Sequence, residues 1–90
     1  MFKESLNTAV FTTRFVVKEG SEIVYVSHDE EGNWSFFGAE QDIRTEDVRI
    51  IGLGEIIQLD ETIIEIGNLE SGCKSSRKSK GDGWDIYSES

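Results

Sequence analysis

Cysteine is almost absent from this chain, since Cys73 is the only one among 90 residues. A single thiol cannot close an intramolecular disulfide, which is typical of proteins from a reducing compartment. No apolar run approaches the roughly 18–20 residues of a membrane-spanning helix. The beginning, MFKESLNTAVF, also lacks the apolar core of a signal peptide. These absences predict a cytoplasmic protein.

Basic residues are scarce as well: nine lysines and arginines stand against 18 aspartates and glutamates, which gives a net charge of −9. Phosphate backbones repel such a surface, so nucleic-acid binding would require a local basic patch. An acidic surface instead favours basic partners, because complementary charge speeds their encounter. Solubility alone is the alternative explanation for the charge.

The chain also lacks the patterns that carry catalysis. Its glycines at 52, 54, 81 and 83 have neither the strand–loop–helix context nor the Lys-Ser/Thr of a phosphate loop. His28 is the only histidine, and nothing in the sequence orients it against Cys73 as a nucleophile pair. A metal site needs three or four converging ligands. We therefore expect no enzyme, no cofactor and no metal.

The stretch HDEEGNWSFFG, residues 28–38, raises the one question of a site. Its histidine and three carboxylates could bind a metal or transfer protons, but Asp, Glu, Gly and Asn are also the residues that a solvated turn prefers. Gly32 or Asn33 can take a positive φ at little cost. The interpretation we favour is a hairpin with residues 29–33 as its loop, with His28 at the surface, and with Trp34 and Phe36 facing the core.

The chain is predicted to form a single domain over residues 1–90, because it is short and holds no repeat or low-complexity linker. Its hydrophobic periodicity predicts the α+β class. Alternation in residues 9–18 predicts one strand with Ala9, Phe11, Phe15 and Val17 on one face. Further strands are expected at 23–28, 34–37 and 48–53, and as a pair around the KGDG turn of residues 80–83. We expect an antiparallel sheet of about five strands.

A short helical pair is expected between the strands, over about residues 53–66. Leu53, Ile56 and Ile57 have helical spacing, and Asp60 is placed to cap a second short helix that stops at Gly67. The pair would lay its isoleucines on one face of the sheet. In the final segment, Trp84, Ile86 and Cys73 are expected to supply apolar contacts.

Charge suggests two opposite binding surfaces. The first is an acidic surface on the loop and turns, for a basic partner, and comprises Glu30, Glu31, Glu40, Asp42, Glu46 and Asp47. The second is residues 74–80, which carry four of the nine basic residues and no acid. Their basic side chains, Lys74, Arg77, Lys78 and Lys80, would bind an acidic partner or fold back on the chain's own acidic surface. We favour the acidic surface, because it carries most of the charge.

The frame GNWSFFGAEQD … IIGLGEIIQLDETIIEIGNLESG resembles bacterial immunity-type domains, small proteins encoded near secreted polymorphic toxins. The resemblance covers about residues 22–84. The matching positions are Trp34, Phe36, Phe37, Gly38, Asp42, Leu53, Ile57, Asp60, Ile63, Leu69 and Gly72, and Arg77 falls where related small proteins carry arginine. The chain departs from the family at Cys73, where relatives often have Trp.

The resemblance implies a role and no catalytic set. It predicts a non-enzymatic interaction protein that neutralises a protein toxin by steric occlusion, with an acidic surface set against a basic effector. A small regulatory or otherwise uncharacterised binding module without a toxin partner is the alternative function.

Overall fold

The computed structural model describes residues 2–88 as one α+β unit. In chain order its elements are β1 (Ala9–Thr13), α1 (Arg14–Val17), β2 (Tyr25–His28), β3 (Trp34–Phe37), η1 (Thr45–Asp47), β4 (Val48–Gly52), α2 (Leu53–Leu59), η2 (Glu61–Ile66), β5 (Cys73–Ser76) and β6 (Asp85–Ser88), where η denotes a 3₁₀ helix. None of the helices within residues 2–88 has the length and apolar character needed to cross a bilayer.

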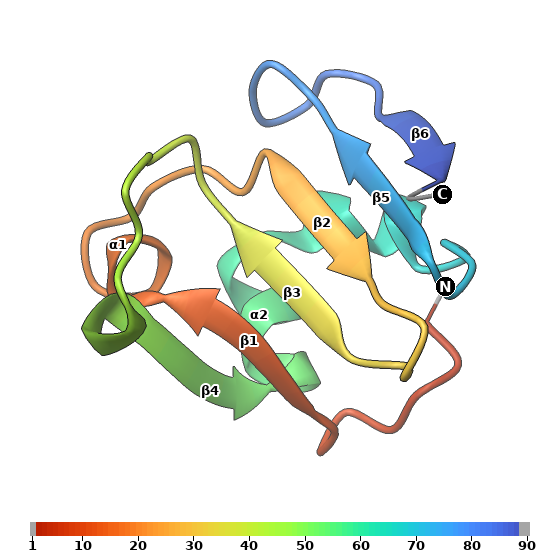
Figure 1. Cartoon of the computed structure of the whole chain (residues 1–90), viewed down its shortest axis with the longest axis horizontal. Coiled ribbons are helices and arrows are strands. Elements are labelled where there is room, and N and C mark those ends of the chain that lie inside the picture. Colours follow the sequence, from red (N-terminus) through yellow and green to blue (C-terminus); the bar gives the residue numbers. More distant parts are fainter. Residues whose placement is uncertain (1, 89–90) are drawn as a thin grey trace.

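The strands form one mixed sheet of six strands in the order β4-β1-β3-β2-β5-β6 (Figure 1). The β1–β3 pair is parallel and the other four pairs are antiparallel. The predicted α+β class and short helices are confirmed. The sheet has one strand more than the five expected, and the hairpin of β2 and β3 makes it mixed by placing β3 beside β1.

The predicted strand over residues 9–18 is wrong in its second half. The strand ends at Thr13, whose hydroxyl accepts the backbone N–H of Val16 and so caps the short helix α1. The buried residues are Val10, Thr12, Thr13 and Val16. On the predicted apolar face, Ala9 is exposed and Phe11, Phe15 and Val17 are only partly buried. The sequence favours neither face clearly, because apolar and β-branched side chains occur on both.

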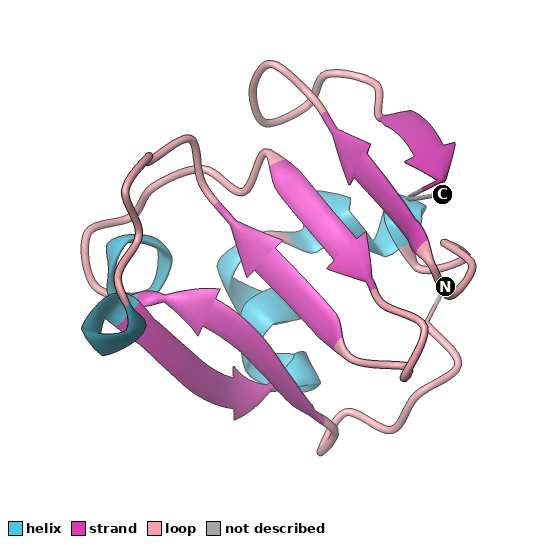
Figure 2. Cartoon of the chain, in the orientation of Figure 1, coloured by secondary structure: helices cyan, strands magenta, loops and turns pink. Residues whose placement is uncertain are grey.

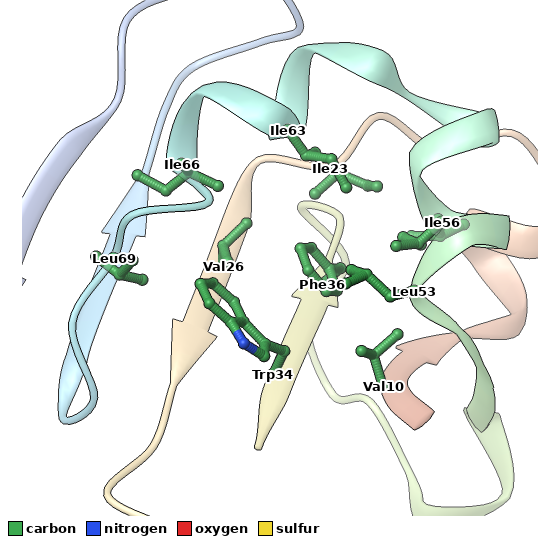
Figure 3. Packing of buried hydrophobic residues seen from close by; sticks show 11 residues of the cluster. Val10, Ile23, Val26, Trp34, Phe36, Leu53, Ile56, Ile63, Ile66 and Leu69 are labelled. Carbon is green, nitrogen blue, oxygen red and sulfur yellow. The ribbon is translucent and has the colours of Figure 1, made fainter. Parts of the chain in front are cut away.

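The core lies between the sheet and the helices α2 and η2 (Figure 3). Trp34 and Phe36 are 1% and 0% exposed, which confirms their predicted inward position. The helices contribute the side chains expected of an amphipathic pair: Leu53, Ile56, Ile63 and Ile66 are all buried.

The predicted helix signals are confirmed at Asp60 and corrected beyond it. The Asp60 carboxylate accepts the backbone N–H of Thr62 at 2.9 Å, as an N-cap should. Gly67 ends η2, but with a φ of −63° that any residue can adopt. At the C-terminal strand, Ile86 is 61% exposed instead of packed, whereas Trp84 does pack on the core.

The predicted hairpin at residues 28–38 is confirmed. Strands β2 and β3 pair in register, and the backbone N–H of Asp29 donates to the carbonyl of Asn33 at 3.0 Å. The Asp29 carboxylate accepts the backbone N–H groups of Asn33 and Glu31, which lowers the pKa of Asp29. Gly32 adopts a φ of +89°, where a side chain would be strained. His28 differs from the expectation, because its side chain is only 12% exposed.

Candidate protein-binding surface

The sheet has one face that the long helical segment leaves uncovered. Figures 1 and 2 show α2 and η2 behind the sheet, and the opposite face, turned to the viewer, is the open face. Strand register assigns side chains to it, because cross-strand partners lie on the same face. One row on the open face crosses all six strands through Ile50, Phe11, Ser35, Ser27, Lys74 and Tyr87.

The open face carries a shallow hollow that is lined by aromatic side chains. Tyr25 and Phe37 are cross-strand partners on β2 and β3, and their rings stack with centroids 6.2 Å apart and planes 9° apart. They line a hollow of about 500 Å³ together with Ile43 and Glu40 from the segment that follows β3. We call this the Tyr25–Phe37 hollow. A pocket with an apolar base and a carboxylate in its lining suits a ligand that is both apolar and cationic.

Glu40 is held in the lining of this hollow by its neighbours. Its Oε2 accepts a hydrogen bond from the Ser21 hydroxyl. Its Oε1 passes so close to Gly38 that a Cβ there would lie 2.5 Å from it, so a side chain at this position would displace the carboxylate. Oε1 itself is buried and finds no donor among residues 2–88. A shielded carboxylate oxygen without a donor is costly.

The six predicted acidic residues do not form one surface. Glu30 and Glu31 lie at the tip of the β2–β3 hairpin, between the end of β2 and the start of β3. Glu40, Asp42 and Glu46 follow the end of β3; Glu40 and the two neighbours of Asp42 line the Tyr25–Phe37 hollow, whereas Glu46 lies in η1, just before β4. The structure therefore divides the set into a hairpin group and a loop group at opposite ends of one strand. Asp47 belongs to neither group.

Asp47 lies inside the protein, with 7% of its surface exposed. Its Oδ2 accepts the backbone N–H of Arg44 at 3.0 Å, and its Oδ1 accepts from Arg14 Nε at 2.8 Å. The Arg44 N–H and the Arg14 guanidinium together hold the pKa of Asp47 below its usual range. Asp47 fastens the loop to α1 and is not a rim charge.

Replacing Asp47 by asparagine should destabilise the protein in a pH-dependent way. Because the folded-state pKa of Asp47 is lowered, its contribution is fully present above the unfolded-state value and is lost as the pH falls below about 4. Urea unfolding should therefore show wild type more stable than Asp47→Asn at pH 7, with the difference shrinking towards pH 2. The exposed Glu65→Gln serves as control. A difference that is independent of pH would contradict the ion-pair role.

The alternative basic surface is not assembled either. Arg77, the central residue of the run, is buried against Asp60 and does not face solvent. Lys78 and Lys80 are exposed, and the Lys80 backbone N–H donates to the Glu22 carboxylate at 3.0 Å. The predicted folding back on acidic residues thus holds for Arg77, and residues 74–80 do not present four basic side chains on one face.

Sequence reasoning overlooked the aromatic half of the surface. The segment 23–28 is apolar on both of its faces, a pattern that is typical of a central strand. That same pattern could have identified Tyr25 as a residue of the second face, because Val26 occupies the first. Phe37 carries the equivalent signal after Phe36, since neighbouring strand residues alternate between the faces.

Comparison of the chain with protein-family models, with curated proteins and with solved structures gave no match. The immunity-type resemblance thus stands on the residues quoted for it, and function has to be argued from the surface itself.

Proposed function

We propose that this protein is a non-enzymatic binding protein whose open sheet face docks a basic protein partner. The observation that carries the proposal is the Tyr25–Phe37 hollow, with two stacked aromatic rings and the Glu40 carboxylate in its lining. Aromatic side chains on a preformed surface are the usual anchors of protein interfaces. Glu40 adds a negative charge that a lysine or arginine of the partner would complement.

Charge supports a basic partner. The chain carries a net charge of −9, and the segment that follows β3 adds the exposed carboxylates Asp42 and Glu46. Such a field steers a basic protein towards this end of the sheet and raises its association rate about 10–10³-fold at low salt. The paired arginines Arg14 and Arg44 reduce the local field, but Arg14 is already bound to Asp47 and Glu19.

The immunity-type resemblance supplies the class of partner: a secreted toxin whose active surface the open face would occlude. The matched residues Phe37 and Gly38 lie in the hollow, and matched Asp42 follows it. Occlusion requires no catalytic group. A regulatory module would use the same hollow for a partner without toxic activity, so the identity of the partner distinguishes the two roles.

The test is to identify the partner by pull-down from the native cell with mass spectrometry and then to measure its association and dissociation rates. The loop variant combines Glu40→Gln, Asp42→Asn and Glu46→Lys; asparagine is used at Asp42 because that residue has a φ of 58°. The matched hairpin variant, Glu30→Lys with Glu31→Lys, changes the net charge by the same amount. We expect the loop variant to associate about tenfold more slowly, and the hairpin variant to change much less.

A third variant separates docking from steering. Tyr25→Ser should mainly speed dissociation, by about 30-fold, as expected when a central aromatic anchor is truncated. Equal slowing by the loop and hairpin variants would show that only net charge matters and would contradict docking at the hollow. Tight binding of a partner that has no toxic activity would support the hollow and contradict the immunity role.

A further inference from the structure

A second pocket lies on the other side of the sheet from the Tyr25–Phe37 hollow. It has a volume of about 370 Å³ and is lined by Lys3, Glu4, His28, Trp34 and residues 67–71. His28 and Trp34 are cross-strand partners on the helix-covered face, at the hairpin end of β2 and β3. The pocket is thus built where the N-terminal segment crosses the end of the core, and the proposed function does not use it.

Glu4 brings an ionised carboxylate into this pocket. Its Oε2 accepts from Trp34 Nε1 at 2.9 Å, whereas its Oε1 is buried and has no donor within residues 2–88. Burial by itself raises the pKa of Glu4. The hydrogen bonds from the Trp34 indole and from the backbone N–H groups of Glu4 and Lys3 outweigh burial and lower the pKa overall. Glu4 is therefore charged at neutral pH, and its Oε1 has no donor within residues 2–88.

His28 supplies a second acceptor. Its Nδ1 lies 2.8 Å from the carbonyl oxygen of Leu69, and because a carbonyl can only accept, Nδ1 carries the hydrogen. In the neutral ring Nε2 is then a bare acceptor. The ring is stacked on Trp34 with centroids 4.0 Å apart, which fixes its orientation. Nε2 and Glu4 Oε2 are 3.9 Å apart, too far for a direct hydrogen bond.

The pocket thus holds two acceptors, Glu4 Oε1 and His28 Nε2, and no hydrogen-bond donor within residues 2–88 is bound to Glu4 Oε1. Lys3 also lines the pocket, but it is exposed and does not donate to Glu4 Oε1. The complementary ligand must carry at least two N–H donors and a positive charge. It must also be small, because the pocket is at the lower end of the size range for ligand sites.

We propose that this pocket binds an organic cation, an alkylammonium or guanidinium group that donates to Glu4 and to His28 Nε2. The Glu4 side chain is 27% exposed, and the terminal torsion of a glutamate rotates easily, so Oε1 can turn towards a ligand. The group is either a free small amine or the side chain of a lysine or arginine on a peptide. Both sources carry the same cationic N–H donors, and titrations with free cations and with peptides distinguish them.

The test follows the two indole N–H resonances of ¹⁵N-labelled protein during titration with butylammonium chloride and with methylguanidinium chloride. Trp34 donates to Glu4 inside the pocket, and Trp84 packs elsewhere, over Arg77, and serves as an internal control. We expect the Trp34 resonance to shift saturably, with a Kd in the millimolar range, and the Trp84 resonance to stay in place. Sodium chloride at equal ionic strength should move neither.

Matched variants decide whether the carboxylate is the ligand. Glu4→Gln keeps an oxygen that can accept from the Trp34 indole but removes the charge, and it should weaken butylammonium binding at least about tenfold. The exposed Glu65→Gln changes the net charge equally and should leave binding unchanged. Equal loss in both variants would overturn the proposal, as would a Trp34 resonance that does not respond at about 50 mM of either cation.

The source of the cation is read from a second pair of titrations, with the peptides Gly-Lys-Gly and Gly-Arg-Gly, both blocked at their ends. Tighter binding of a peptide than of the matching free cation identifies a side chain of a protein partner as the ligand. Tighter binding of the free cations identifies a small amine. Both results support the pocket, and their failure leaves docking at the Tyr25–Phe37 hollow unaffected, because the two sites lie on opposite faces of the sheet.

Discussion

Replacing Arg77 by methionine should destabilise the fold by about 3–5 kcal/mol, because it leaves a buried carboxylate without its counter-charge. Arg77 Nη2 lies 2.8 Å from Asp60 Oδ2, and the two residues are 7% and 4% exposed. The same guanidinium donates to the carbonyl of Ile23 and to the hydroxyl of Thr62, and it stacks over the Trp84 ring at 4.2 Å. One side chain thereby joins the segment before β2, the α2–η2 junction and the C-terminal loop.

Companion variants separate charge from packing. Arg77→Lys keeps the charge but loses the planar fork that reaches several acceptors, so it should recover only part of the stability. Asp60→Asn retains an oxygen to cap Thr62, and adding it to Arg77→Met should make the double variant more stable than Arg77→Met alone. Urea unfolding, followed by circular dichroism, measures these differences. An Arg77→Met protein within about 0.5 kcal/mol of wild type would contradict the role of the pair.

The hairpin and the helical pair were predictable because their signals are local. The acidic, glycine-containing loop at residues 29–33 marks a turn by itself, and the spacing of Leu53 and Ile56 marks a helix by itself. Trp34 and Phe36 follow from the same alternation. These features need no knowledge of what lies across the sheet.

Other features depend on contacts between distant parts of the chain. The ion pair of Asp60 and Arg77 spans 17 residues, and nothing at either position reveals it, because Asp60 also has a complete local role as a cap. Asp47 likewise looks like a loop acid until Arg14 is placed beside it by the pairing of β1 with β4. A charged residue in a sequence is normally predicted to be exposed, and this prediction fails where two opposite charges are buried together as a pair.

The candidate surface was predictable in part for the same reason. Glu40 was identified from its charge and lines the Tyr25–Phe37 hollow, and the exposed acid Asp42 lies between two residues that line it, Gln41 and Ile43. The aromatic base was not, because an apolar residue in a strand is assigned to the core unless the opposite face is known to be open. That face is open because the chain supplies one helical layer, α2 with η2, and uses it on the other side.

Cutting Trp34 to alanine should cost about 3–5 kcal/mol, a large part of the stability of about 5–15 kcal/mol usual for a small domain. Trp34 is 1% exposed and is surrounded by rings: His28 stacks on it at 4.0 Å, and Phe2 meets it edge-on at 4.9 Å. Removing it leaves a cavity that several elements line, so relaxation of one neighbour cannot fill it. Phe36→Ala, at 0% exposure, should have a loss of the same size.

The conservative variant Trp34→Phe tests whether packing or hydrogen bonding dominates. Phenylalanine keeps an aromatic ring between His28 and Phe2 but has no N–H for Glu4, which then loses its one indole donor. We expect Trp34→Phe to retain most of the stability that Trp34→Ala loses, since the area buried by the ring outweighs a single partly exposed hydrogen bond. Denaturant midpoints that fall from wild type to Trp34→Phe and much further to Trp34→Ala, at an unchanged m-value, would support this expectation. A folded Trp34→Ala protein of near-native stability that had lost partner binding would instead place Trp34 on the functional surface.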